Sequence, residues 1–273
     1  MAAFALAESN ANIILTGRNE RAGRVLVRRL KHRAPSSQIQ FIAADLANQR
    51  QVRILAAAIA ERFVDVSVLI NNAGARFDTY HESADGIELT FATNHIGHFL
   101  LTNLLSERLV RAPAARVITV ASSSHAGATA EGEWSVSRTS YDRRLAYAKS
   151  KLANVMFAYE LAERFSRTHL TSNAVDPGGV ASNFARNNGV ASWLRHLAAH
   201  ARQRDLVTSR TGASALVYLA TSAEVVGVTG KYFRRGRQTE SSAASRDRQA
   251  SRRLWDLSLE LTGLNGPTES IQA

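Results

Sequence analysis

Short runs rich in isoleucine and valine recur along the chain, and between them apolar residues return every three or four positions. The short runs have the length and composition of buried strands, and the spaced patterns have the period of amphipathic helices. Strands that alternate with helices indicate an α/β fold, in which helices cover both faces of a parallel sheet. The expected strands are 12–16, 40–44, 66–70, 116–121, 172–175 and 231–233. The expected helices are 21–33, 49–62, 86–109, 147–164 and 211–221.

No internal repeat or Gly/Ser-rich linker divides this pattern, and we expect one domain over residues 1–273. Hydrophobic residues make up 45% of the chain, which is enough for a buried core. Cysteine is absent, which excludes disulfides and thiolate catalysis. The eight histidines form no His-Glu-x-x-His motif, so no metal site is expected. A serine hydrolase would need a Gly-x-Ser-x-Gly elbow, which does not occur.

The net charge of the chain is +11, and seven arginines fall between Arg234 and Arg253. Clustered arginines neutralise phosphates, so a nucleic-acid partner is one interpretation of this stretch. No aromatic residue interleaves with these arginines as a platform for stacked bases, and we therefore favour a solvated surface with no nucleic-acid partner.

The longest apolar stretches, such as 54–60, are too short to cross a bilayer, which takes about 20 residues. The opening residues lack the basic start of a signal peptide. We expect no integral membrane segment and a cytoplasmic location.

Tyr147 and Lys151 are four residues apart on an expected helix, so the phenol and the ammonium lie on the same face. A free tyrosine has a pKa near ~10, and a neighbouring ammonium lowers it by stabilising the phenolate. Such a pair suits proton exchange with an alcohol or carbonyl oxygen. Taken alone, the spacing is also compatible with an interfacial tyrosine and a solvated lysine.

Three expected strands end in small or polar residues: Asn71 to Gly74 follow one, Ser122 follows another, and Pro177-Gly178 follows a third. The carboxyl ends of parallel strands meet at one edge of a sheet, which is where open α/β sheets bind ligands. These segments therefore converge on one candidate site.

With these residues the chain resembles the short-chain dehydrogenase/reductase family, and within it the branch that includes retinol dehydrogenases. The resemblance covers nearly the whole chain, and the long interval between Ser122 and Tyr147 is typical of that branch. The matching motifs are Asp45-Leu46, Asn71-Asn-Ala-Gly74, Thr93-Asn94-His95-Ile96-Gly97-His98-Phe99-Leu100-Leu101-Thr102, Ser122, Tyr147-x-x-x-Lys151, Ser150-Lys-Leu-Ala-Asn154, Pro177-Gly178, Leu254-Trp-x-x-Ser258 and Leu261-Thr-Gly-Leu264.

The resemblance implies a catalytic set of four residues. Tyr147 is the acid–base residue, and Lys151 lowers its pKa and binds the nicotinamide ribose. Ser122 bonds to the substrate oxygen as charge develops there, and Asn94 holds a water that links Lys151 to solvent. The implied cofactor-binding residues are Arg18, Asp45, Leu46, Asn71, Ala73, Gly74, Tyr147, Lys151, Pro177, Gly178, Val180 and Ser182.

Arg18 follows the strand whose end selects between the two nicotinamide cofactors. An acidic residue there favours the ribose diol of NAD, and an arginine favours the 2′-phosphate of NADP. No acidic residue stands at the tip, so we expect NADP(H) to be preferred over NAD(H). A surface charge is the alternative role for Arg18.

The family's phosphate-binding turn, Thr-Gly-x-x-x-Gly-x-Gly, has no match in the chain. Thr16-Gly17 begins like it, but Arg21 stands where the second glycine is required, and its bulk excludes close approach to a pyrophosphate. We therefore expect Thr16-Gly17 to end the second strand of the family fold, and residues 1–9 to be the tail of its first helix. The first strand of the doubly wound sheet is then missing, and either the true start lies upstream or the chain is a remnant.

The leading functional hypothesis is hydride transfer between NADP(H) and an alcohol, aldehyde or ketone, lipophilic by resemblance. The alternative is an inactive Rossmann-fold remnant or scaffold that cannot bind the cofactor. The resemblance also implies a homodimer or homotetramer through the helices that carry Asn94 and Tyr147, and a mobile lid over the pocket at 181–205.

Overall fold

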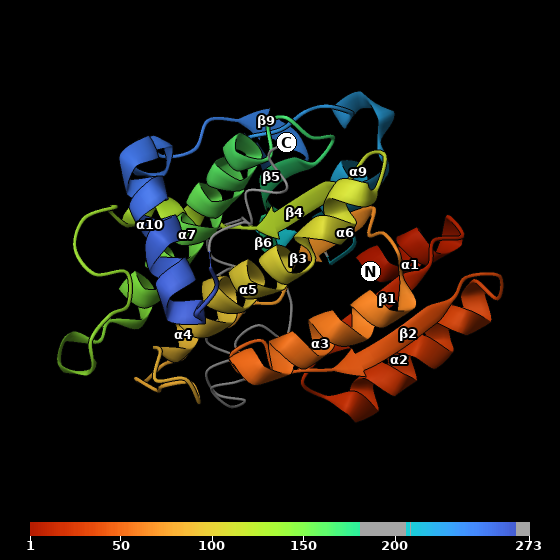
Figure 1. Cartoon of the computed structure of the whole chain (residues 1–273), viewed down its shortest axis with the longest axis horizontal. Helices are drawn as coiled ribbons and strands as arrows, with labels where there is room; N and C mark the ends of the chain where they lie inside the picture. Colours follow the sequence, from red (N-terminus) through yellow and green to blue (C-terminus); the bar gives the residue numbers. More distant parts are fainter. Residues whose placement is uncertain (181–205, 208, 266–273) are drawn as a thin grey trace.

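The computed structural model of the protein describes residues 1–180, 206–207 and 209–265 (Figure 1). Its first half contains α1 (Ala2–Glu8), β1 (Ile13–Gly17), α2 (Glu20–Arg33), β2 (Ile39–Ala43), α3 (Gln49–Arg62), β3 (Val68–Asn71), α4 (Leu89–Phe91), the π-helical turn η1 (Ala92–Ile96), α5 (Gly97–Leu104), α6 (Ser106–Arg111) and β4 (Arg116–Val120). Its second half contains η2 (Ser123–Gly127), η3 (Arg138–Ser140), α7 (Arg143–Arg164), β5 (Thr171–Asp176), β6 (Gly179–Val180), β7 (Leu206–Val207), α9 (Ser209–Thr221), η5 (Ala223–Val225), β8 (Lys231–Arg234), β9 (Arg237–Thr239), η6 (Ala244–Arg246) and α10 (Arg248–Thr262).

The predicted α/β class is confirmed, because all six expected strands form and the pairs β1–β2, β3–β4, β4–β5 and β5–β8 are parallel. Three described strands were not predicted: the short β6 and β7, which pair with each other, and β9, which returns antiparallel to β8. The tight turn between them needs positive φ angles, which Arg235 (52°) and Gly236 (80°) adopt.

The strands form two separate main sheets, β1-β2 and β3-β4-β5-β8-β9. Among the described strands, none hydrogen-bonds to both β1 and β3, which is the place where the sequence analysis expects a missing strand. In Figure 1 the β1-β2 pair lies to one side of the larger sheet.

Helix α1 packs against the cores of both sheets. Ala2 and Leu6 contact the cluster built on β3, β4 and α9, whereas Phe4 and Ala7 belong to the cluster of α2 and β2. On the opposite face, one cluster joins Ile14 and Ile42 of the small sheet to α3, α5 and β3. Apolar packing on both faces therefore holds the two sheets together without a shared ladder.

The prediction of one continuous helix over 86–109 is wrong. The helical segment starts only at Leu89, changes to the π-helical turn η1 over Ala92–Ile96, and is interrupted at Leu105 before α6. The π turn places Asn94 in the interior, and such turns occur preferentially at functional sites. The helix predicted over 147–164 begins earlier, at Arg143, because Asp142 caps its first turn by accepting from the amides of Arg144 and Leu145.

Candidate active site

Tyr147 and Ser122 meet at the carboxyl end of β4. Tyr147 lies in the second turn of α7, which packs along η2 and β5. Ser122 directly follows the strand and its buried neighbour Ala121. The two side chains share a hydrogen bond. The structure thus brings together the two residues that are predicted, by resemblance, to act on a substrate oxygen.

The ammonium of Lys151 is buried beside them. It donates to the carbonyl oxygen of Val120 at 2.9 Å, and Asn154 donates to the same oxygen at 3.0 Å. The Nζ atom lies 5.7 Å from the centre of the Tyr147 ring. Burial lowers the pKa of Lys151 to about 8, and the carboxylate of Asp176 partly opposes this by raising it.

The pKa of Tyr147 moves in the direction opposite to the sequence-based expectation. Burial raises it to about 12, while the hydrogen bond from Ser122 lowers it and the charge of Asp176 raises it. The Lys151 ammonium is engaged by Val120 and faces the ring rather than the phenol oxygen. Desolvation of the phenolate therefore dominates, and the cation that lowers the pKa of Tyr147 against it is Arg76.

The side-chain amide of Asn94 forms hydrogen bonds to two segments next to the site. Its nitrogen donates to the carbonyl of Ala75 and to Ser150 Oγ, both at 2.9 Å, and its oxygen accepts from the amide of Ala75 at 2.7 Å. Ser150 in turn donates to the carbonyl of Tyr147 at 2.8 Å. The side chain of Asn94 therefore links the loop after β3 to the helix turn that carries Tyr147. A water on this side chain would use the second lone pair of the amide oxygen.

The motif after β3 lies at the same sheet edge. Asn71 is buried, and its amide nitrogen donates to Thr102 Oγ1 at 3.0 Å. Its Oδ1 atom is buried and has no hydrogen-bond partner among the described residues. Ala73 packs against the core cluster of α3 and α5, and Gly74 is half-buried next to it.

Asp45, Leu46 and Arg18 lie at the ends of the two small-sheet strands. The carboxylate of Asp45 accepts from the amide of Ala47 at 3.0 Å, and Leu46 is buried in the core. Arg18 is exposed directly after β1. These three residues therefore follow the carboxyl ends of β1 and β2, in a sheet that is separate from the one that contains β3.

The turn after β5 contains Pro177 and Gly178, both half-buried. Gly178 has a φ of 86°, a conformation that favours glycine. Val180 ends the short strand β6, which pairs with β7. Ser182 and the expected lid at 181–205 lie outside the described residues.

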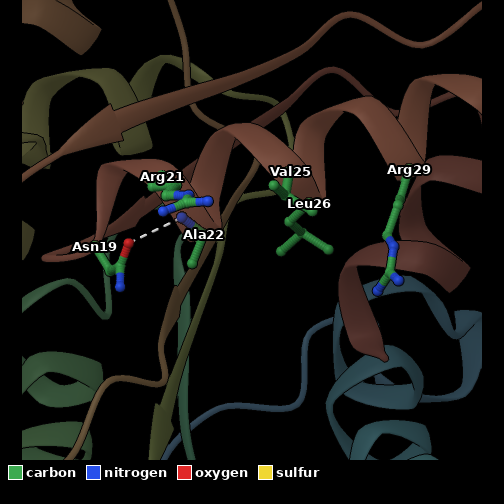
Figure 2. Close-up of a pocket in the computed structure, with 6 residues that line it drawn as sticks. All are labelled: Asn19, Arg21, Ala22, Val25, Leu26 and Arg29. Carbon is green, nitrogen blue, oxygen red and sulfur yellow. Dashed lines mark hydrogen bonds between the residues drawn. The ribbon is translucent and has the colours of Figure 1, made fainter.

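The start of α2 does not offer an open phosphate site. The Oδ1 atom of Asn19 accepts from the amide of Ala22 at 2.9 Å, so a first-turn amide is already satisfied (Figure 2). Arg21 lines a shallow depression on this helix together with Val25 and Leu26. The parallel pairing of β1 with β2, register Gly17 with Ala43, fits the interpretation of Thr16-Gly17 as a strand end.

Asp176 and Arg76 are site residues that the sequence analysis did not identify. Asp176 is a buried carboxylate at the end of β5 whose charge acts on both Tyr147 and Lys151. Arg76 follows the Asn71–Gly74 motif and lowers the pKa of Tyr147. The place of Asp176 immediately before Pro177-Gly178 was the available signal.

Within the described part of the chain, no helix has the length and apolarity needed to span a membrane.

Comparison with known proteins places this site in a family. Residues 1–192 match the short chain dehydrogenase family. The chain is 36% identical over 220 residues to mouse retinol dehydrogenase 14, covering 81% of this chain and 66% of the relative. It is 32% identical over 266 residues to human polyprenol dehydrogenase, covering 95% of this chain and 80% of the relative. The chain thus spans slightly less than two thirds of the first relative's length.

Solved structures share the fold. A crystal structure of an uncharacterized protein from Mycobacterium paratuberculosis superimposes with a TM-score of 0.74 at 29% identity, covering 97% of this chain and 89% of that one. The RhlG/NADP active-site complex of Pseudomonas aeruginosa gives a TM-score of 0.68 at 26% identity, covering 85% and 88%. The predicted Rossmann-like fold is therefore confirmed by similarity as well as by its own topology.

Proposed function

The chain belongs to the short-chain dehydrogenase family, in its retinol-dehydrogenase-like branch, and from this premise we propose that it transfers a hydride between NADP(H) and a lipophilic alcohol or carbonyl compound. The observation that carries the proposal is the meeting of Tyr147, Ser122 and Lys151 at the carboxyl end of β4. The dehydrogenase relatives support an enzyme over an inactive scaffold.

The nicotinamide end of the cofactor fits the residues around β4 and β5. The buried ammonium of Lys151 is a donor for ribose hydroxyls, and Asn71 Oδ1 is an acceptor without a partner. The pyrophosphate fits less well, because the start of α2 is capped by Asn19 and residues 16–21 hold no glycine-rich turn. When bound, the nicotinamide supplies or accepts the hydride.

The proton chemistry belongs to Tyr147. Its phenol is protonated at neutral pH and donates a proton to a carbonyl oxygen that gains negative charge during reduction. Ser122 stabilises the developing negative charge by a second hydrogen bond. The positive charge of Lys151 near the ring favours the phenolate left behind, and Asn94 holds the turn that carries Tyr147.

The preference for NADP(H) rests on Arg18, the exposed cation after β1, because a guanidinium binds a 2′-phosphate bidentately. The NADP complex among the similar structures supports a nicotinamide dinucleotide at this fold.

The relatives named after retinol and polyprenol support a long apolar alcohol or its aldehyde as substrate. A homodimer or homotetramer is part of the proposal, formed through the helices that carry Asn94 and Tyr147; α10 packs on the second of these helices, α7.

The test is a rate measurement with NADPH and a series of aldehydes from a short aliphatic aldehyde to retinaldehyde. The proposal predicts NADPH consumption that increases in kcat/KM with apolar chain length. Equal rates across the series would refute the lipophilic substrate class, and no aldehyde-dependent consumption at saturating NADPH would refute the oxidoreductase assignment.

A further inference from the structure

One buried carboxylate joins the two turns that form the active-site edge. The side chain of Asp176 is 4% exposed, at the last position of β5. Its Oδ2 atom accepts from the amide of Ser123 at 2.9 Å, and its Oδ1 atom accepts from the amide of Gly178 at 2.8 Å. Ser123 follows Ser122 after β4, and Gly178 lies in the turn after β5. The same side chain therefore fixes both turns.

We propose that Asp176 is a positioning residue of this site: its carboxylate fixes the turn that presents Ser122 and places a negative charge at the strand ends beside Lys151. The first part follows from the two amide bonds and the burial. The second follows from position, because the bond to the Ser123 amide holds the carboxylate three residues beyond Val120, whose carbonyl oxygen binds the Lys151 ammonium. The consequence for catalysis rests on the proposed oxidoreductase function, whereas the structural and electrostatic roles do not.

A carboxylate is the group that these contacts require. Two backbone amides point at the side chain from opposite turns, so both of its oxygens must accept. An asparagine would accept from one amide and present its own N–H groups to the other, which leaves a buried donor without a partner. Charge-assisted bonds from backbone amides are also stronger than neutral ones.

The charge of Asp176 is shared among several groups. Arg234 approaches from β8, with Nε at 3.7 Å from Oδ2, and its side chain is 46% exposed. Asp176 raises the pKa of Lys151 against the effect of burial, and it also raises the pKa of Tyr147. It therefore favours a charged lysine and a neutral phenol. The titratable groups that face it are Tyr147 and Lys151 from α7, His125 from η2, and Tyr232 and Arg234 from β8.

The experiment measures the titration of Lys151 directly. The chain has four lysines, Lys31, Lys149, Lys151 and Lys231, so the ¹³Cε signals of lysine-labelled full-length protein are few enough to follow one by one by NMR. A Lys149→Arg variant removes the signal of Lys149 and so distinguishes it from that of Lys151 on the same helix. No substrate or cofactor is needed, so the result is separate from the proposed activity.

Asp176→Asn is expected to lower the pKa of Lys151 from about 8 by about 1, as loss of an adjacent opposite charge does. The amide signal of Ser123 is expected to shift in the same variant. Asp176→Glu keeps the charge and is expected to restore most of the lysine pKa. Asp247→Asn is the matched control, because Asp247 also accepts a backbone amide, that of Ala250, but at the start of α10.

An unchanged Lys151 titration in folded Asp176→Asn would overturn the counter-charge role, and an unchanged Ser123 signal would overturn the positioning role. If Asp176→Asn does not fold, as judged by circular dichroism, Asp176→Ser replaces it, since a hydroxyl still accepts one amide. Failure of both to fold would assign Asp176 to general stability and reject the proposal. A shifted lysine in a protein without dehydrogenase activity would reject the proposed function alone.

Discussion

His95 and His98 are fully enclosed in the interior of the η1–α5 segment. Burial lowers the pKa of each to about 3, and for His98 the neighbouring charge of Lys151 lowers it further. Both ring nitrogens of His98 are buried without a hydrogen-bond partner. Both imidazoles are therefore expected to be neutral in the folded protein near pH 7.

Acid is expected to destabilise the protein through these histidines. The folded pKa of His98 lies below its ordinary 6.5, so its contribution to stability is complete above pH 6.5 and is lost as the pH falls toward about 3. At pH 4.5 the loss is on the order of 3 kcal/mol for one histidine. Urea unfolding at pH 7.5 and pH 4.5 should therefore show a smaller difference in the free energy of unfolding for His98→Leu than for the parent protein. Equal differences would contradict the buried, neutral imidazole.

Arg18→Asp is expected to reduce the ratio of kcat/KM for NADPH to that for NADH by about tenfold or more, because a repulsive charge replaces a partner of the 2′-phosphate. Arg21→Asp is the matched control, since Arg21 is also an exposed arginine at the same end of the fold. An unchanged ratio in Arg18→Asp would make Arg18 a surface charge only.

At the residue scale, spacing was sufficient to identify the Tyr147–Lys151 pair but not its electrostatics. The i, i+4 rule places the two side chains on one face wherever the helix forms. The degree of desolvation depends on α7 packing against η2 and β5, which no local pattern contains. For the same reason Asp176 could be read only as a turn residue, although its two amide bonds come from separate strands' ends.

At the element scale, the close approach of α5 to the Asp45-Leu46 loop depends on one glycine. A Cβ at Gly97 would lie 2.1 Å from the carbonyl oxygen of Leu46. Gly97→Ala is expected to lower the free energy of unfolding by about 1–3 kcal/mol, as overpacking does, and to weaken NADPH binding because Asp45 moves. Gly127→Ala is the control, since nothing lies within 4 Å of its added Cβ. Equal unfolding midpoints for the two variants in a thermal melt would contradict this contact.

The helices that follow simple periodicity could be predicted almost to the residue. Gln49–Arg62 is capped by Asn48, which accepts from the amide of Gln51, and it coincides with the predicted range. The structure of segment 86–109 could not be predicted in this way. Its π turn accompanies the burial of Asn94, which bonds to Ala75 and Ser150, and these partners are distant in sequence. Helix α10 was not predicted. Its Trp255 packs on Phe99 and Phe157, and these contacts between distant segments are not visible in the local pattern.

At the scale of the whole molecule, the break between β1 and β3 separates the predicted adenosine side of the site from the catalytic side. Among the described strands the two sheets share no ladder of hydrogen bonds, and apolar packing of α1 and α3 joins their cores. The sequence indicated this break through Arg21 in the place of a glycine. It could not indicate that α1 would contact both cores, because that depends on the tertiary placement of Leu6 and Phe4.

The 273-residue chain is expected to bind NADPH more weakly than micromolar, since residues 16–21 hold no glycine-rich turn that lets a pyrophosphate approach the amides at the start of α2. Calorimetric titration measures this directly, with heat-denatured protein as the control. A dissociation constant in the low micromolar range would show that other parts of the chain hold the pyrophosphate.

The central claim, that Tyr147 transfers the proton during carbonyl reduction, is tested most directly by the rate of retinaldehyde-dependent NADPH consumption in Tyr147→Phe at saturating NADPH. Loss of the phenol should reduce kcat by about 100- to 10,000-fold, with NADPH affinity nearly unchanged because the ring remains in place. Tyr159→Phe, which removes another hydroxyl from α7, bonded to Ser241, should retain the parent rate. Parent-like turnover by Tyr147→Phe would contradict the account.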